Sequence, residues 1–175
     1  MIQDKIKAAI RDVKDFPKEG IIFKDITPIL EDPELTKEIT HVFADEARKL
    51  DVDAIMGVES RGFFWGMLIA QELNVPFIPV RKKGKLPYKT VSYKYDLEYG
   101  SAEIEVHEDV IKKGSNILIH DDLLATGGTA AAAAEIAIAQ GANVSGFSFL
   151  VNLEFLNGAE RLKKYSNNIK GLVNY

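Results

Sequence analysis

A loop that follows an apolar run has the residue types that hold a phosphate. The segment Asp121–Thr129 reads Asp-Asp-Leu-Leu-Ala-Thr-Gly-Gly-Thr and comes directly after Ile117–His120. Glycines let backbone N–H groups approach a ligand closely, and the N-terminus of a helix favours an anion. Thr126 and Thr129 add hydroxyl donors. Because ligands of α/β sheets bind beyond the carboxyl ends of the strands, this loop indicates a phosphate site.

The two aspartates of the loop suit a different part of the same ligand. Asp121 and Asp122 would repel phosphate, but they can accept hydrogen bonds from sugar hydroxyls. They could also stabilise positive charge that develops on a ribose ring. We therefore interpret the motif as a cradle for ribose 5-phosphate, and a capped loop with solvated aspartates is the alternative. Its binding residues would be Asp121, Asp122, Ala125, Thr126, Gly127, Gly128 and Thr129.

Other chemistry finds little support in the sequence. The chain has no cysteine, which excludes disulfides, thiolate metal sites and cysteine nucleophiles. The run Gly57–Gly62 has the glycine spacing of a P-loop, but Phe63 and Phe64 replace the required Lys-Ser/Thr pair. The three histidines are scattered without metal-ligand spacing.

Charge and hydropathy point away from nucleic acid and membrane partners. The formal net charge is −4, so a nucleic-acid surface over the whole chain is not expected. No apolar stretch approaches the roughly 18–20 residues of a membrane helix. Charges interrupt the first residues too early for a signal peptide, and we expect a cytoplasmic protein.

The elements around the loop alternate in a way that predicts a mainly parallel sheet flanked by helices, in a single domain over residues 1–175. Apolar spacing predicts a helix over residues 3–13, and Asp32-Pro33 predicts the start of a second helix that runs to Leu50. A polar stretch over residues 84–107 breaks the rhythm and reads as a hairpin, which would form a flap. The expected strands are Ala54–Val58, Phe77–Val80, Val91–Tyr95, Ala102–Val106, Asn116–His120 and Val144–Val151, with further helices at Phe63–Leu73 and Thr129–Gln140.

Five segments together resemble the adenine phosphoribosyltransferase family. The cradle is similar to the phosphoribosyl pyrophosphate motif of type I phosphoribosyltransferases and by itself indicates only that superfamily. The other four segments are Phe16-Pro17 with Gly20–Pro28, Glu59–Phe63, Arg81–Pro87 and Leu97–Gly100. The resemblance implies the type I phosphoribosyltransferase fold, with a small hood and a flexible flap. It also implies formation of AMP and pyrophosphate from adenine and phosphoribosyl pyrophosphate in purine salvage, with Mg²⁺ as cofactor, and a homodimer.

The resemblance also assigns residues to the pyrophosphate and to the flap. Glu59, Ser60, Arg61, Arg81, Lys82 and Lys85 would bind pyrophosphate, and the family has a non-proline cis peptide where Glu59-Ser60 stands. Mg²⁺ would be held mainly by the substrate, with no direct protein ligand. The flap would close over the reactants to exclude water. Glu98, at its turn, would exchange a proton with the base, and Tyr99 would help place the flap.

For the base, the resemblance points to Ile22, Phe23, Lys24 and Leu153. Phe23 would stack on the purine, the backbone of Ile22 and Lys24 would read its edge, and Leu153 would cover the other face. Core packing is the alternative for Phe23.

Four positions depart from the family pattern, namely Lys24, His120, Asn152 and Ala159. His120 could alter the charge near Asp121 or could face the core. Asn152 and Ala159 leave the details of the base pocket open.

Two other functions compete with this reading. A 6-oxopurine could replace adenine, because readout by backbone groups does not distinguish the bases from sequence. A regulator that senses phosphoribosyl pyrophosphate and binds DNA is the second alternative. Such a protein would carry an additional DNA-binding segment, and we expect none, because the first helix directly precedes the segment that begins at Phe16.

Overall fold

The computed structural model describes residues 1–97 and 100–175, and its chain divides into two compact units, Met1–Val42 and Phe43–Tyr175. The expectation of one domain over residues 1–175 therefore stays a prediction. Within the described residues, no helix is both long and apolar enough to cross a membrane.

The first unit is built around a short antiparallel hairpin. Strand β1 pairs with β2, and Val13 lies opposite Phe23. The helix expected over residues 3–13 ends earlier than predicted, because Ile10 is extended and Arg11–Lys14 take their backbone partners from β2. The spacing of apolar residues did not indicate that β2 would pair with this segment and end the helix. The elements are α1 (Ile2–Ala9), β1 (Arg11–Lys14), β2 (Ile22–Asp25), α2 (Thr27–Leu30) and the first part of α3 (Pro33–Ala47).

Helix α3 begins where the sequence predicts. Pro33 is its first residue, and the Asp32 carboxylate accepts a hydrogen bond from the Leu35 N–H at 3.0 Å. The α-helix ends at Ala47 and continues as a 3-10 turn, η1 (Arg48–Leu50), so the predicted limit at Leu50 holds for the helical segment as a whole.

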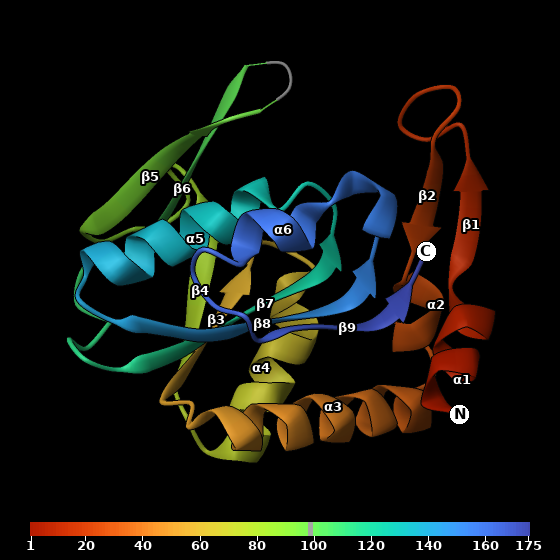
Figure 1. Ribbon diagram of the computed structural model, residues 1–175, viewed down its shortest axis with the longest axis horizontal. Helices are drawn as coiled ribbons and strands as arrows, with labels where there is room; N and C mark the ends of the chain where they lie inside the picture. The colour runs from red at the N-terminus through yellow and green to blue at the C-terminus, as the bar shows by residue number, and fades with distance from the viewer. Residues whose placement is uncertain (98–99) are drawn as a thin grey trace. The chain divides into compact units, whose positions relative to one another are not determined.

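The second unit contains a sheet of seven described strands in the order β5-β6-β4-β3-β7-β8-β9. Strands β4, β3, β7, β8 and β9 are parallel, and the hairpin β5–β6 joins the edge of β4 in antiparallel fashion (Figure 1). The strands are β3 (Ala54–Val58), β4 (Phe77–Lys82), β5 (Thr90–Asp96), β6 (Ser101–His107), β7 (Asn116–Leu124), β8 (Asn143–Asn152) and β9 (Ile169–Asn174).

Helices cover both faces of this sheet. Helix α4 (Gly62–Leu73) lies on one face, and α5 (Gly128–Ala139) and α6 (Gly158–Leu162) lie on the other (Figure 1). A short turn, η2 (Glu154–Leu156), precedes α6. The alanines Ala130–Ala134 are all buried, since α5 contacts strands of the sheet, the hairpin strand β5 and α6. Small side chains allow that close approach on several sides.

Most predicted elements of this unit are confirmed, and two were missed. Strand β7 was expected to end at His120, but it pairs with β8 as far as Leu124, so both aspartates of the cradle lie within the strand. Strand β9 and helix α6 were not predicted. The sequence signals for both are weak, since β9 has only six residues and α6 only five.

Helix α4 begins unusually close to β7, and this contact yields a test. A Cβ atom at Gly62 would lie 2.9 Å from the backbone oxygen of His120 and 3.0 Å from Asp121 Oδ1. We expect Gly62→Ala to lower the free energy of unfolding by about 1–3 kcal/mol in urea titrations, because backbone must shift to admit the methyl group.

Gly128→Ala is the matched control for that change. A Cβ there would meet the end of the flexible Arg161 side chain at 3.1 Å rather than backbone. If both variants unfold at the wild-type urea concentration, the α4–β7 contact is not a tight constraint.

Candidate active site

The predicted cradle forms a tight turn between β7 and α5. Gly127 has a φ of +78° and immediately precedes α5. A Cβ on Gly127 would lie 2.8 Å from the backbone oxygen of Gly158, so a larger residue does not fit. Thr126 is exposed, and the first N–H groups of α5 follow at Gly128. The turn thus presents hydroxyl and backbone donors at the N-terminus of a buried helix.

The two aspartates lie together at the end of β7 with Arg61. Asp122 is 4% exposed, and its Oδ2 lies 2.8 Å from Arg61 Nε in an ion pair. Asp121 is half-buried, and its Oδ1 accepts the Asp122 N–H at 2.9 Å. Burial raises the pKa of both carboxyls. The neighbouring Asp122 raises the pKa of Asp121 further, whereas Arg61 opposes the rise at Asp122.

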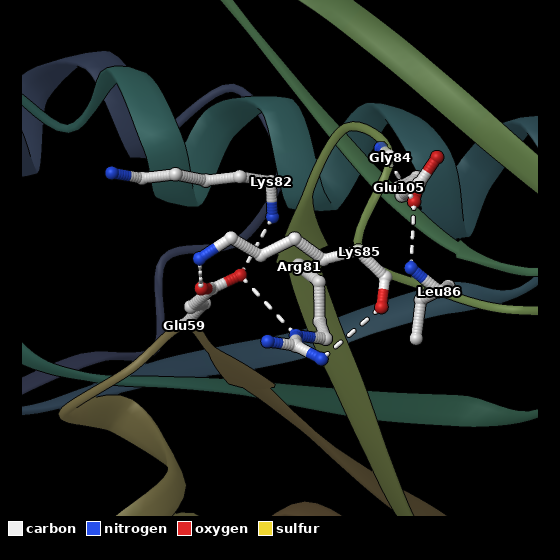
Figure 2. A network of polar contacts seen from close by, with 7 residues as sticks. All are labelled: Glu59, Arg81, Lys82, Gly84, Lys85, Leu86 and Glu105. Atoms are coloured by element: carbon white, nitrogen blue, oxygen red, sulfur yellow. Dashed lines mark hydrogen bonds and ion pairs between the residues drawn. The ribbon is translucent and has the colours of Figure 1, made fainter.

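Three of the expected pyrophosphate residues, Arg81, Lys82 and Lys85, contact the side chain of Glu59, which is 10% exposed. Glu59 Oε1 lies 2.7 Å from Lys85 Nζ, while Oε2 accepts the Lys82 N–H at 2.8 Å and pairs with Arg81 Nε at 3.4 Å (Figure 2). Burial alone would raise the pKa of Glu59, but these contacts outweigh it and lower the pKa to about 2. The Glu59-Ser60 peptide bond is cis, as the family resemblance implied.

Glu105 is a central residue of this network that sequence reasoning missed. It is 2% exposed, and its Oε1 accepts the N–H groups of Gly84 at 3.0 Å and Leu86 at 3.2 Å (Figure 2). Its Oε2 accepts the Thr90 hydroxyl at 3.1 Å. The signal in the sequence that could have indicated this role was a charged residue, Glu105, within an expected strand of the hairpin that follows the basic segment.

A cavity of about 400 Å³ joins the two groups of residues. Its walls come from β3, β4, β7, α5 and the hairpin, and they include Glu59, Lys82, Tyr95, Asp121 and Thr129. The structure therefore brings the predicted cradle and one end of the basic segment to the same space. Arg81 and Lys85 contact this site through Glu59.

The predicted flap is a hairpin of β5 and β6. The two strands pair from Thr90, which lies opposite His107, to Asp96, which lies opposite Ser101. The Tyr95 hydroxyl lies 3.0 Å from the Thr129 hydroxyl, so a hydrogen bond connects the hairpin to the cradle. The predicted roles of Glu98 and Tyr99 concern positions outside the described residues.

The expected base residues lie in both units. In the first, Ile22 is exposed, the Phe23 ring meets the Phe16 ring edge-on at 5.2 Å, and Lys24 Nζ pairs with Asp12 Oδ1 at 2.7 Å. In the second unit, Leu153 is half-buried and its N–H donates to the Leu124 oxygen at 2.9 Å, directly before the cradle turn.

Three of the positions that depart from the family pattern, His120, Asn152 and Ala159, lie in the second unit. His120 is fully buried, its Nδ1 lies 2.8 Å from Ser148 Oγ, and burial lowers its pKa to about 3. It therefore faces the core as a neutral ring. Ala159 packs against the hydrophobic core that contains the alanines of α5, and Asn152 is half-buried next to Gly171.

Metal-binding side chains are not concentrated anywhere in the described ranges. Residues 1–97 and 100–175 contain no group of three or more histidine, aspartate or glutamate residues that could hold a metal ion.

The low pKa of Glu59 predicts how acid affects this site. A carboxyl whose folded pKa lies below its unfolded value of 4.5 adds stability above that pH, and this stability is lost as the pH falls towards about 2. We expect Glu59→Gln to cost on the order of 3 kcal/mol at most at neutral pH. The difference from wild type should shrink between pH 4.5 and 2 in chemical unfolding.

The exposed Glu34 provides the control for this measurement. Glu34→Gln should track the wild type over the same range of pH. A Glu59→Gln difference that stays constant from pH 5 to pH 2 would contradict the assigned ion pairs.

Comparison with known proteins now places the chain in a family. The model of the phosphoribosyl transferase domain family matches residues 25–172. Adenine phosphoribosyltransferase of Cytophaga hutchinsonii is 49% identical over all of this chain and 97% of the relative, and that of Methanococcus vannielii is 49% identical over 97% of both. The crystal structure of the enzyme from Thermoanaerobacter pseudethanolicus matches with a TM-score of 0.95 and 43% identity over 99% of both chains. That from Saccharomyces cerevisiae, complexed with an imino-altritol bisphosphate and adenine, matches with a TM-score of 0.90 and 39% identity over 98% of both. The chain thus belongs to the adenine phosphoribosyltransferase family of pentosyltransferases.

Proposed function

We propose that this adenine phosphoribosyltransferase, which forms AMP in purine salvage, binds the 5-phosphate of phosphoribosyl pyrophosphate in the turn Ala125–Thr129. The observation that carries the proposal is the tight turn at Gly127, which opens the N-terminus of α5 beside two carboxylates. Backbone N–H groups and the hydroxyls of Thr126 and Thr129 would donate to the phosphate oxygens. Asp121 and Asp122 would accept from the ribose hydroxyls.

In the reaction, N9 of adenine forms a bond to C1′ of the ribose as the bond from C1′ to pyrophosphate breaks. The electron pair of the broken bond leaves with pyrophosphate, and positive charge develops on the ribose. Asp122, whose Oδ2 lies 2.8 Å from Arg61 Nε, is one carboxylate that would stabilise that charge. Asp121 would assist from the cavity wall.

Pyrophosphate would bind to the cations gathered around Glu59. Arg81, Lys85 and Lys82 supply guanidinium, ammonium and backbone donors within one small region. Arg61 and the backbone of Glu59-Ser60 would add donors from the other side. The contacts of Glu59 with these groups support the proposal, because they hold the donors close together (Figure 2).

Mg²⁺ would be held mainly by oxygen atoms of the substrate. Magnesium sites of this kind take one or two carboxylates and several phosphate or water oxygens. The Asp121 carboxylate lines the same cavity as Lys82 and Thr129, so it could accept hydrogen bonds from water on such an ion without binding the ion directly. The bound ion would neutralise charge on the leaving pyrophosphate.

The β5–β6 hairpin would act as a flap that excludes water from the activated ribose. The hydrogen bond between Tyr95 and Thr129 supports this role, because it links the hairpin to the cradle. In the sequence between the two strands, Glu98 would exchange a proton with the base and Tyr99 would help place the flap. For the base itself, Phe23 would stack on a face of adenine and the backbone of Ile22 and Lys24 would read its edge, as the family resemblance implies.

A homodimer in the cytoplasm completes the proposal. Helix α4 exposes a cluster of large apolar side chains, Phe64, Met67 and Leu68, which are 40%, 51% and 36% exposed. Burying these side chains against a second copy would remove apolar surface from water.

The activity is tested with a purine panel. Purified protein is incubated with phosphoribosyl pyrophosphate, Mg²⁺ and adenine, hypoxanthine, guanine or xanthine, and nucleotide formation is followed. We expect AMP from adenine only. Asp122→Asn should lower kcat by about 100-fold, because it removes negative charge from beside the developing ribose cation. Glu98→Gln should also lower kcat if the proton transfer is correct.

Asp109→Asn, at an exposed aspartate of the same unit, is the control and should retain wild-type rates. Turnover of a 6-oxopurine would overturn the base assignment. Binding of phosphoribosyl pyrophosphate without turnover of any base would favour a sensor.

The dimer is tested by light scattering after size exclusion. The wild type should have twice the chain mass of 19.4 kDa, and Met67→Glu should shift it towards monomer because a charge enters the apolar surface. Phe155→Glu, at another exposed apolar residue, should remain dimeric. A monomeric wild type at micromolar concentration would exclude the proposed assembly.

A further inference from the structure

One buried carboxylate, that of Glu105, holds the backbone of the loop Lys82–Leu86, whose cations we propose to bind pyrophosphate. Glu105 on β6 accepts the N–H groups of Gly84 and Leu86, which flank Lys85 on both sides. Within the loop, the Lys85 N–H also closes a turn onto the Lys82 oxygen at 3.3 Å. Gly84 has a φ of +86°, which allows the chain to bend at that point. The backbone around Lys85 is therefore held on the side of Glu105.

The two carboxylates of the network act on opposite sides of the loop. Figure 2 shows Glu105 against the backbone of Gly84 and Leu86, while the Lys85 side chain extends away from it to Glu59. Glu59 contacts the cationic side chains, whereas Glu105 contacts mainly the backbone. Arg81 adds a further contact to the loop, because its Nη1 donates to the Lys85 oxygen at 3.2 Å.

A carboxylate at this buried position requires a reason. Burying an ionised group is costly unless it is paired and hydrogen-bonded. Glu105 meets that condition through two backbone N–H groups, the Thr90 hydroxyl and Lys83 Nζ, which lies 3.6 Å from its Oε2. Thr90 is the first residue of the flap strand β5, so the same carboxylate also ties the loop to the base of the flap.

We propose that Glu105 is a positioning residue for the leaving group, which holds the Lys82–Leu86 loop in the shape that binds pyrophosphate. This inference rests on the proposed pyrophosphate site. It assigns no contact between Glu105 and the substrate. Its effect passes through Lys85 and Lys82, whose positions depend on the backbone that Glu105 holds.

The test compares two ligands that differ only in the pyrophosphate. Calorimetry measures the Kd of phosphoribosyl pyrophosphate and of ribose 5-phosphate with wild type, Glu105→Ala and Glu105→Gln. Glu105→Ala should weaken phosphoribosyl pyrophosphate by about tenfold and change ribose 5-phosphate by less than about twofold. Glu105→Gln should recover most of the loss, because its amide oxygen can still accept the two N–H groups. In turnover, the KM of phosphoribosyl pyrophosphate should rise while that of adenine is unchanged.

Glu108, which directly follows β6, provides the control. Its side chain is exposed and lies 3.9 Å from Lys89 Nζ, outside the Lys82–Leu86 loop. Glu108→Ala should bind both ligands as the wild type does. Equal losses for both ligands in Glu105→Ala would mean a general structural role and would overturn the inference. If Glu105→Ala does not fold, Glu105→Gln is measured instead, and an equal rise in the Kd of both ligands would overturn the inference in the same way.

A double-mutant cycle separates this inference from the site on which it rests. If Glu105 acts through Lys85, the double variant Glu105→Ala/Lys85→Ala should lose less binding free energy for phosphoribosyl pyrophosphate than the sum of the two single losses. Full additivity would overturn the proposed route. If Lys85→Ala weakens phosphoribosyl pyrophosphate and Glu105→Ala does not, the positioning role alone is wrong. If neither change has an effect while the wild type binds, the proposed pyrophosphate site is wrong and the inference falls with it.

Discussion

Parallel pairing of β3 with both β4 and β7 is the constraint on which the site depends. In this arrangement three strands deliver their carboxyl ends to one edge, so Glu59 follows β3, Arg81 and Lys82 end β4, and Asp121 lies near the end of β7. The close approach of α4 to β7 at Gly62 then fixes the height of that helix above the sheet. Residues more than sixty positions apart in the chain meet in one cavity for this reason.

Charge in the site is balanced locally before any substrate arrives. Arg61 pairs with Asp122, and Glu59 pairs with Lys85 and Arg81. An anionic substrate that bound here would replace some of these ion pairs with contacts between the cations and its own oxygen atoms. Because desolvated charges are costly alone, this pairing keeps the cations organised at a small energetic cost. The Asp122 carboxylate, paired with Arg61, and the Glu59 carboxylate, paired with Lys85 and Arg81, thus have different cationic partners.

The hairpin β5–β6 is part of the main sheet at its root and part of the site at its middle. Its register with β4 places Glu105 opposite Arg81, and Tyr95 reaches the cradle through Thr129. Through Glu105 and Thr90, the root of the hairpin is also bound to the basic loop. A flap built in this way shares contacts with both halves of the substrate site that we propose.

The sequence by itself determined the strands β3, β4 and β7, the glycine turn after β7, and the basic segment beside it, because apolar runs and glycines act locally. It also carried the family resemblance that the comparisons confirm. Tertiary structure alone decided that Val13 joins β1 rather than a helix, that His120 turns into the core, and that Arg61 pairs with Asp122. It also decided the contacts of Glu105, whose neighbours in the chain do not indicate that Gly84 and Leu86 will donate to it. Each of these outcomes depends on partners that are distant in sequence, and local patterns do not encode which partner a backbone or carboxylate will meet.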